Sequence, residues 1–112
     1  MAHDTELEKV LDATTRTWEG LAKKKMFGGV VYMVHGNICV GIWQDHLIIR
    51  AGDAVETMMA EDDRFRPFDV TGRAMQGWAM LGPDGWRDPA VRKAAIDKAR
   101  AFCRNLPKKS PK

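Results

Sequence analysis

The sequence lacks the features of several protein classes. No apolar run approaches the ~20 residues that a helix needs to cross a bilayer, and the acidic N-terminus has no apolar stretch of the kind found in secretion signals. Only two cysteines and three histidines are present among 112 residues, without C-x-x-C or H-x-x-x-H spacing, so the usual metal sites are not indicated. We therefore expect a cytoplasmic protein with no membrane segment, no metal and no cofactor.

Catalytic groups are also scarce. Cys39 is a candidate nucleophile, and His35 or His46 would have to serve as its base. The pattern places Cys39 inside a strand, without a helix N-terminus or a basic neighbour to lower its pKa. We expect Cys39 and Cys103 to be buried thiols, not a structural disulfide, as is usual in a reducing compartment. The sequence therefore predicts no catalytic residues.

The charge of the chain is nearly balanced. Lysine and arginine number 18 and aspartate and glutamate 15, and three of the lysines lie in the final residues 107–112. Without those three lysines the basic and acidic residues are equal in number, so composition does not indicate a basic face spread over the whole domain. The one internal basic cluster is Lys23, Lys24 and Lys25, which we place at the end of a helix, where cations meet the negative end of the helix dipole. Nucleic-acid binding through these lysines and the tail is an alternative function.

Gly28 and Gly29 follow the lysines and resemble a phosphate-binding loop in composition. A phosphate loop places its glycines between a strand and a helix, whereas here a helix precedes them and a strand follows. We favour a bulge or a close backbone approach at the start of the strand. A small-ligand pocket beneath this point is a further alternative.

Apolar periodicity predicts the elements of one α+β domain. A helix is expected over residues 6–22, strands over 26–34, 38–43 and 46–50, and a short helix from Gly52 and Asp53 to the acidic residues 61–63. Two further strands are expected over 66–70 and 77–81, and Asp88 caps a last helix in which Pro89 is the first residue. The order α-β-β-β-α-β-β-α predicts an antiparallel sheet of about five strands with flanking helices. We expect a single domain over residues 1–106 and a disordered basic tail over 107–112.

Two motifs resemble those of a known family. The first is Lys25-Met26-Phe27-Gly28-Gly29, with Gly36-Asn37 at the tip of the hairpin that it opens. The second is Arg66-Pro67-Phe68 followed by Thr71-Gly72-Arg73-Ala74-Met75-Gln76-Gly77-Trp78. In this order, over roughly residues 5–106, they resemble the N-terminal domain of the TfoX/Sxy competence-regulator family. We take these as structural positions of the motifs: Met26, Phe27, Gly28, Gly29, Gly72, Gly77 and Trp78.

The resemblance implies a sheet-plus-helices fold similar to secretion-chaperone-like α+β domains. It also implies a family role in regulating natural-transformation genes together with the cyclic-AMP receptor protein. That role belongs to longer members with a second, helical C-terminal domain, which we do not expect in this chain. The resemblance transfers no catalytic or ligand-binding residue.

Arginine and tryptophan are enriched at interface hot spots, so both are candidate partner contacts. Trp78 is expected in the core beneath the sheet, whereas Trp86, between Gly85 and Arg87, is placed for exposure. Arg73, Trp86 and Arg87 are therefore the candidate partner surface. The leading hypothesis is a non-enzymatic regulatory or adaptor module that contacts a protein partner, with the transcription machinery as one candidate. A homodimer formed through a sheet edge or paired helices is also expected.

Overall fold

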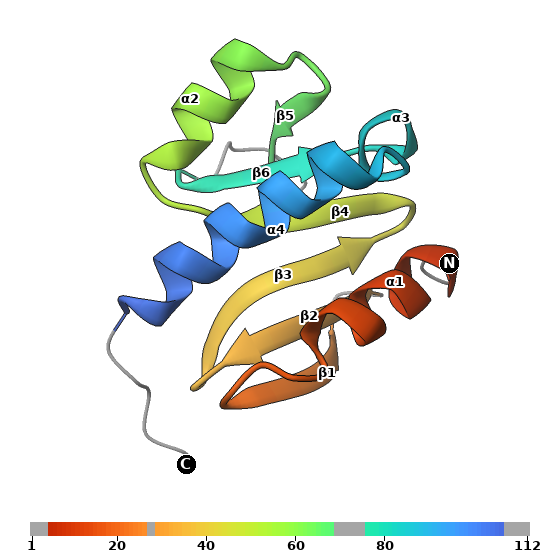
Figure 1. Cartoon of the computed structure of the whole chain (residues 1–112), viewed down its shortest axis with the longest axis vertical. Helices are drawn as coiled ribbons and strands as arrows, with labels where there is room; N and C mark the ends of the chain where they lie inside the picture. Colours follow the sequence, from red (N-terminus) through yellow and green to blue (C-terminus); the bar gives the residue numbers. More distant parts are fainter. Residues whose placement is uncertain (1–4, 27–28, 69–75, 107–112) are drawn as a thin grey trace.

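A computed structural model of the protein describes residues 5–26, 29–68 and 76–106 (Figure 1). The elements follow in the order α1 (Thr5–Thr15), β1 (Leu21–Met26), β2 (Gly29–Val34), β3 (Asn37–Trp43), β4 (His46–Arg50), α2 (Ala54–Glu61), β5 (Phe65–Pro67), β6 (Trp78–Leu81), α3 (Pro83–Trp86) and α4 (Pro89–Arg104). No helix in these described ranges is long and apolar enough to cross a membrane.

The sheet contains six strands in the order β1-β2-β3-β4-β6-β5, and every neighbouring pair is antiparallel. The predicted α+β class, with an antiparallel sheet and flanking helices, is confirmed. The structure adds one strand, β1, and one short helix, α3, to the expected order. Strands β1 and β5 form the two edges of the sheet.

The first helix is shorter than predicted, and this changes the setting of the lysine cluster. Helix α1 ends at Thr15, whose hydroxyl donates a hydrogen bond to the Leu11 carbonyl at 2.7 Å. A threonine that bonds to the backbone in this way is a poor residue for continuing a helix. Gly20 then takes a left-handed conformation with φ 74°, and residues 21–26 pair with β2 over six positions. The interpretation of Lys23, Lys24 and Lys25 as cations at a helix end is therefore wrong, because they lie in an edge strand.

The turns between the next strands agree with the sequence. His35 and Gly36 join β2 to β3 with φ values of 51° and 85°, which is the pair of positive angles that a tight hairpin turn requires. Gln44, with φ 56°, helps to join β3 to β4. Glycine takes such angles at low cost, which is why Gly36 marks the first of these turns in the sequence.

A β-bulge interrupts the β2–β3 pair. Tyr32 is opposite Val40 and Met33 is opposite Ile38, so Cys39 is the extra residue on β3. Both Cys39 and Val40 are fully buried in the hydrophobic core although they are consecutive in a strand. A bulge allows this because it changes the direction of a side chain that would otherwise alternate.

The hydrophobic core lies between the sheet and the helices on one of its faces. Figure 1 shows α4 crossing the middle strands and α1 lying near β1 and β2 on the same side of the sheet. Leu7 and Leu11 of α1 and Ile96 of α4 meet the inward side chains of the strands in this layer. The inward strand residues include Val30, Tyr32, Ile42, Leu47, Ile49, Ala79 and Leu81.

Trp78 does not occupy the core beneath the sheet, and that prediction is wrong. Alternate residues of a strand face opposite sides, and in β6 the core side is taken by Ala79 and Leu81. Trp78 is half-buried, with its ring centroid 5.9 Å from that of Phe68 and 5.5 Å from the guanidinium carbon of Arg50. The ring thus contributes to the end of the sheet, not to its centre.

The structure explains why glycine is required at motif positions Gly29 and Gly77. A Cβ added at Gly29 would overlap the carbonyl oxygen of Ile42, which confirms the expected close backbone approach. Gly77 has φ 86°, and its carbonyl accepts hydrogen bonds from the backbone N–H groups of Ala51 and Gly52 at 3.0 and 3.1 Å. Phe27, Gly28, Gly72, Arg73 and the predicted tail over residues 107–112 lie outside the described residues.

Candidate functional site

Trp86 is buried, so the prediction that it forms an exposed partner contact is wrong. Its side chain is 0% exposed, and its indole N–H donates a hydrogen bond to the Asp45 carbonyl at 2.7 Å. Gly82 caps the short helix α3, whose last residue is Trp86 and in which the indole is buried. Trp86 therefore acts as a core anchor.

Arg87 stays on the surface beside Trp86, but it is engaged within the protein. Its guanidinium carbon lies 5.2 Å from the Trp86 ring centroid, and Nη2 is 3.3 Å from Oε1 of Glu6 in α1. Arg73, the third member of the predicted partner surface, lies outside the described residues. Of the two members that the structure describes, Trp86 is buried and only Arg87 is exposed.

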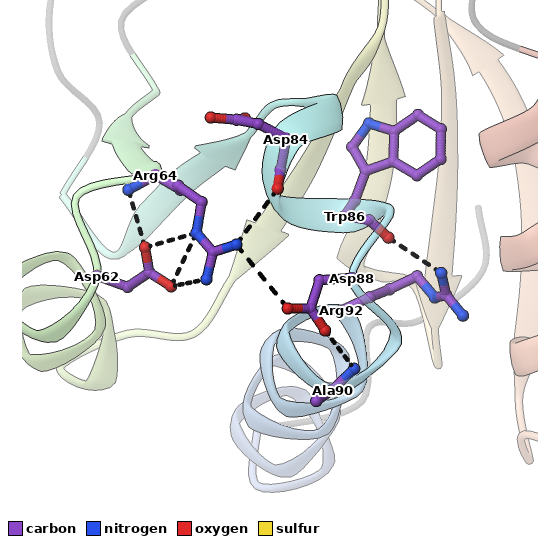
Figure 2. Close-up of polar contacts among 7 residues, drawn as sticks. All are labelled: Asp62, Arg64, Asp84, Trp86, Asp88, Ala90 and Arg92. Atoms are coloured by element: carbon purple, nitrogen blue, oxygen red, sulfur yellow. Dashed lines mark hydrogen bonds and ion pairs between the residues drawn. The ribbon is translucent and has the colours of Figure 1, made fainter.

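A polar network fixes the junction between α3 and α4 (Figure 2). Arg64 donates hydrogen bonds from Nε and Nη2 to the Asp62 carboxylate and from Nη1 to the Asp84 carbonyl. Asp88 accepts from the Ala90 N–H at 3.0 Å, which confirms the predicted cap of the last helix. The Arg64 hydrogen bonds hold the pKa of Asp62 below its usual value.

Arg92 extends this network into α4. Its Nη1 donates to the Trp86 carbonyl at 3.0 Å, as Figure 2 shows. The start of α4 is therefore tied to the segment that carries the buried indole. These contacts position the helix that forms one side of the groove described next.

The lysine cluster is also partly engaged. Lys23 Nζ lies 2.6 Å from Oε2 of Glu8 and 3.0 Å from Oδ1 of Asp12, both in α1. The Tyr32 hydroxyl donates to the same Asp12 carboxylate at 2.7 Å. Hydrogen bonding to Glu8 raises the pKa of Lys23, and burial together with the Asp12 contact raises the pKa of Tyr32 above its usual value. Lys23 thus fastens α1 to the sheet, while Lys24 and Lys25 are exposed.

A groove runs along α4 beside the chain that follows α1. It consists of two adjoining cavities of about 260 and 410 Å³, and both are lined by Trp18 and Arg100. We call their combined space the α4 groove. Its apolar lining includes Val34, Ile96 and Leu106. Its basic lining consists of His35, Arg92, Lys93, Arg100 and Arg104.

Arg100 and Trp18 form the centre of the α4 groove. The Arg100 guanidinium carbon lies 5.0 Å from the Trp18 ring centroid, and the Trp18 side chain is only 7% exposed. The buried ring therefore holds a cation in place at the point where the two cavities meet. Arg104 is one helical turn further along, and Glu19, 90% exposed, lies 4.0 Å from His35 at the rim.

The excess of basic residues in α4 is a sequence feature that the nearly balanced charge of the whole chain does not reveal. The helix carries five basic residues against one acidic residue, Asp97, which pairs with Lys93 at 2.8 Å. The overall balance of the chain hides this local excess because acidic residues lie elsewhere. The spacing of Arg92, Arg100 and Arg104 at multiples of four residues could have indicated one basic side of a helix.

The two thiols lie in the core, as predicted, and neither is in a disulfide. Interaction with the Cys103 thiol, together with burial, raises the pKa of Cys39. The same contact lowers the pKa of Cys103. Within the described ranges no three His, Cys, Asp or Glu side chains gather in a way that could hold a metal ion.

Comparison with known proteins supports the resemblance drawn from the two sequence motifs. The chain matches the TfoX N-terminal domain family over residues 13–103, which is most of its length. No curated protein and no solved structure matches it. The matched region includes all six strands, Trp18, and the part of α4 that carries Arg92 and Arg100. The chain therefore belongs to the TfoX N-terminal domain family.

Proposed function

We propose that the protein is a non-enzymatic regulatory or adaptor module that binds an acidic segment of a protein partner in the α4 groove. Membership of the TfoX N-terminal domain family supports a regulatory or adaptor module in general. The observation that carries the specific proposal is the row of arginines along the groove, with Arg100 held over Trp18. The partner proposed first is a component of the transcription machinery.

The chemistry of the α4 groove suits carboxylates. The guanidinium group of arginine binds a carboxylate through two parallel hydrogen bonds, and such charge-assisted pairs are stronger than neutral ones. Because Trp18 holds Arg100 in place, less side-chain freedom is lost when a ligand binds. Arginine and tryptophan are also the residues most enriched at interface hot spots.

The length of the groove suits an extended peptide. Arg92 and Arg104 are twelve residues apart on one helix, which corresponds to about 18 Å at the usual helical rise. An extended chain of about six residues covers that distance. Apolar lining at Val34, Ile96 and Leu106 would receive an aliphatic side chain between the acidic ones.

Nucleic acid is the competing ligand, because the same basic helix would attract phosphates. Two observations favour the peptide. The face of Trp18 is covered by Arg100, so the ring is not free for a base to stack on it. Lys23, a member of the lysine cluster that the alternative nucleic-acid function would use, is already paired with Glu8 and Asp12.

The test is an NMR titration of the ¹⁵N-labelled protein with an octaglutamate peptide, an octaserine peptide and a short DNA duplex. We expect octaglutamate to shift the Trp18 indole resonance and the α4 amides, and octaserine to leave them unchanged. Arg100→Ala and Arg104→Ala should each weaken binding by about tenfold. Lys98→Ala is the matched control, because it removes an exposed cation of the same helix that does not line the groove. Binding of the duplex without binding of the peptide would overturn the proposal.

A further inference from the structure

The strand bulge and the last helix bring two cysteines together from distant parts of the chain. Cys39 is the extra residue of the bulge in β3, and its side chain is 0% exposed. Cys103 lies in the last turn of α4 and is 2% exposed. A strand without the bulge could not direct both Cys39 and Val40 to the helix-covered face, so the bulge creates this meeting.

The contacts of Cys103 locate its sulfur against the backbone of β3. Its thiol lies 3.6 Å from the carbonyl oxygen of Ile38, the residue that immediately precedes Cys39, and 3.9 Å from the Arg50 carbonyl oxygen. The two thiols are also close enough to affect each other's pKa, which is raised for Cys39 and lowered for Cys103. Both cysteines are free. Two reduced, buried thiols, one in a strand and one in a helix, therefore lie close enough in the core for a disulfide to be considered between them.

We propose that Cys39 and Cys103 form a reversible oxidation site, in which a hydroperoxide converts the thiol pair into a disulfide that ties α4 to the sheet. The inference goes beyond the proposed function and does not depend on it. In a reducing compartment such disulfides are transient and serve redox sensing, because the thioredoxin and glutathione systems reduce them again. In the disulfide form, the helix that carries Arg100 and Arg104 would be covalently linked to β3.

The chemistry needs two steps and one peroxide. Cys103 attacks the peroxide as a thiolate, forming a sulfenic acid while the O–O bond breaks and, with a proton, water or an alcohol leaves. The sulfur of Cys39 then attacks the sulfur of Cys103, and the hydroxyl group leaves as water with the Cys39 proton. Two thiols are oxidised and one peroxide is reduced.

The environment assigns different roles to the two sulfurs. Cys103 lies in the last turn of α4, nearer to an opening for the oxidant, and its pKa is lowered by the Cys39 thiol, so we expect Cys103 to react first. The pKa of Cys39 is raised, so Cys39 stays protonated until the second step. Cys103 is next to the end of α4, where opening of the last helical turn admits a small oxidant more readily than opening of the core does.

The test is treatment of the folded protein with hydrogen peroxide, followed by mass spectrometry without reduction. We expect the intact mass to fall by two hydrogens, a peptide that links Cys39 to Cys103, and full reversal by dithiothreitol. The melting temperature should rise by roughly 10 °C, since the disulfide closes a long loop. Oxidation of the protein unfolded in guanidinium chloride provides the comparison.

Two variants separate the steps. Cys39→Ser should stop the reaction at a sulfenic acid on Cys103, which dimedone traps, and Cys103→Ser should give no crosslink and little dimedone product at Cys39. Thermal melts establish that each variant is folded; where serine unfolds the core, alanine at the same position replaces it. A native protein that keeps both thiols under peroxide, or that forms the crosslink only when unfolded, would overturn the proposal.

Discussion

Replacing Trp86 with alanine should remove a large part of the stability of this protein. Trp86 heads the fully buried side chains by volume in the described part of the chain, and its N–H donates to the Asp45 carbonyl. Large-to-small changes of a buried aromatic residue cost about 3–5 kcal/mol, and the lost hydrogen bond adds about 1 kcal/mol. Domains are stable by only about 5–15 kcal/mol. We therefore expect Trp86→Ala to lose roughly 4–6 kcal/mol, about a quarter of the total or more.

Urea denaturation followed by circular dichroism measures this loss of unfolding free energy. Trp86→Phe keeps most of the ring but removes the donor, so it should lose about 1–2 kcal/mol. Trp43→Ala is the control, because Trp43 is only half-buried, and it should lose clearly less than Trp86→Ala. A loss below about 1 kcal/mol for Trp86→Ala would refute the core role, since surface substitutions have effects of that size or smaller.

Three further variants test the sheet and the pH dependence of stability. Gly29→Ala should lose about 2–4 kcal/mol in the same urea assay, because its Cβ would push the Ile42 carbonyl away, and parent-like stability would contradict the close approach. Tyr32→Phe removes the donor to Asp12 and should lose about 1 kcal/mol at neutral pH. Since the folded-state pKa of Tyr32 is raised, its contribution to the free energy of unfolding is lost as pH rises above about 10. The phenylalanine variant should therefore show a flatter alkaline limb of the stability–pH curve than the parent. The pKa of Asp62 is lowered, so its contribution to the free energy of unfolding is present above about pH 4 and is lost as pH falls. Asp62→Asn should therefore flatten the acid limb of a stability–pH curve. An unchanged acid limb would exclude this carboxylate as a source of acid sensitivity.

Much of the fold was predictable because strong local signals agree with the tertiary structure. Asp88 and Pro89 mark the start of α4 by their own chemistry, a side chain that accepts from a free N–H and a ring that fits the first helical turn. Gly36 marks the first hairpin turn through its positive φ. Such signals act over a few residues and do not depend on what lies across the core.

The errors occur where distant contacts decide the outcome. Residues 21–26 contain three lysines, which favour helix locally, but pairing with β2 along six positions makes them a strand. The flanking Gly85 and Arg87 gave no indication that Trp86 would be buried, because the carbonyl that receives its N–H belongs to Asp45. Part of the candidate site was missed for the same reason: only the fold brings Trp18 against Arg100.

The lysines of β1 have a consequence for the behaviour of the protein at high concentration. An exposed sheet edge presents unpaired backbone groups that can recruit a strand from another molecule, and charged side chains, lysine above all, oppose that pairing. Lys23, Lys24 and Lys25 occupy one outer edge, while the other edge is the three-residue strand β5, which ends at Pro67 and so lacks one backbone donor. Each edge therefore resists the strand-to-strand growth that leads to fibrils. We accordingly expect any self-association to use a helical surface and not an extension of the sheet.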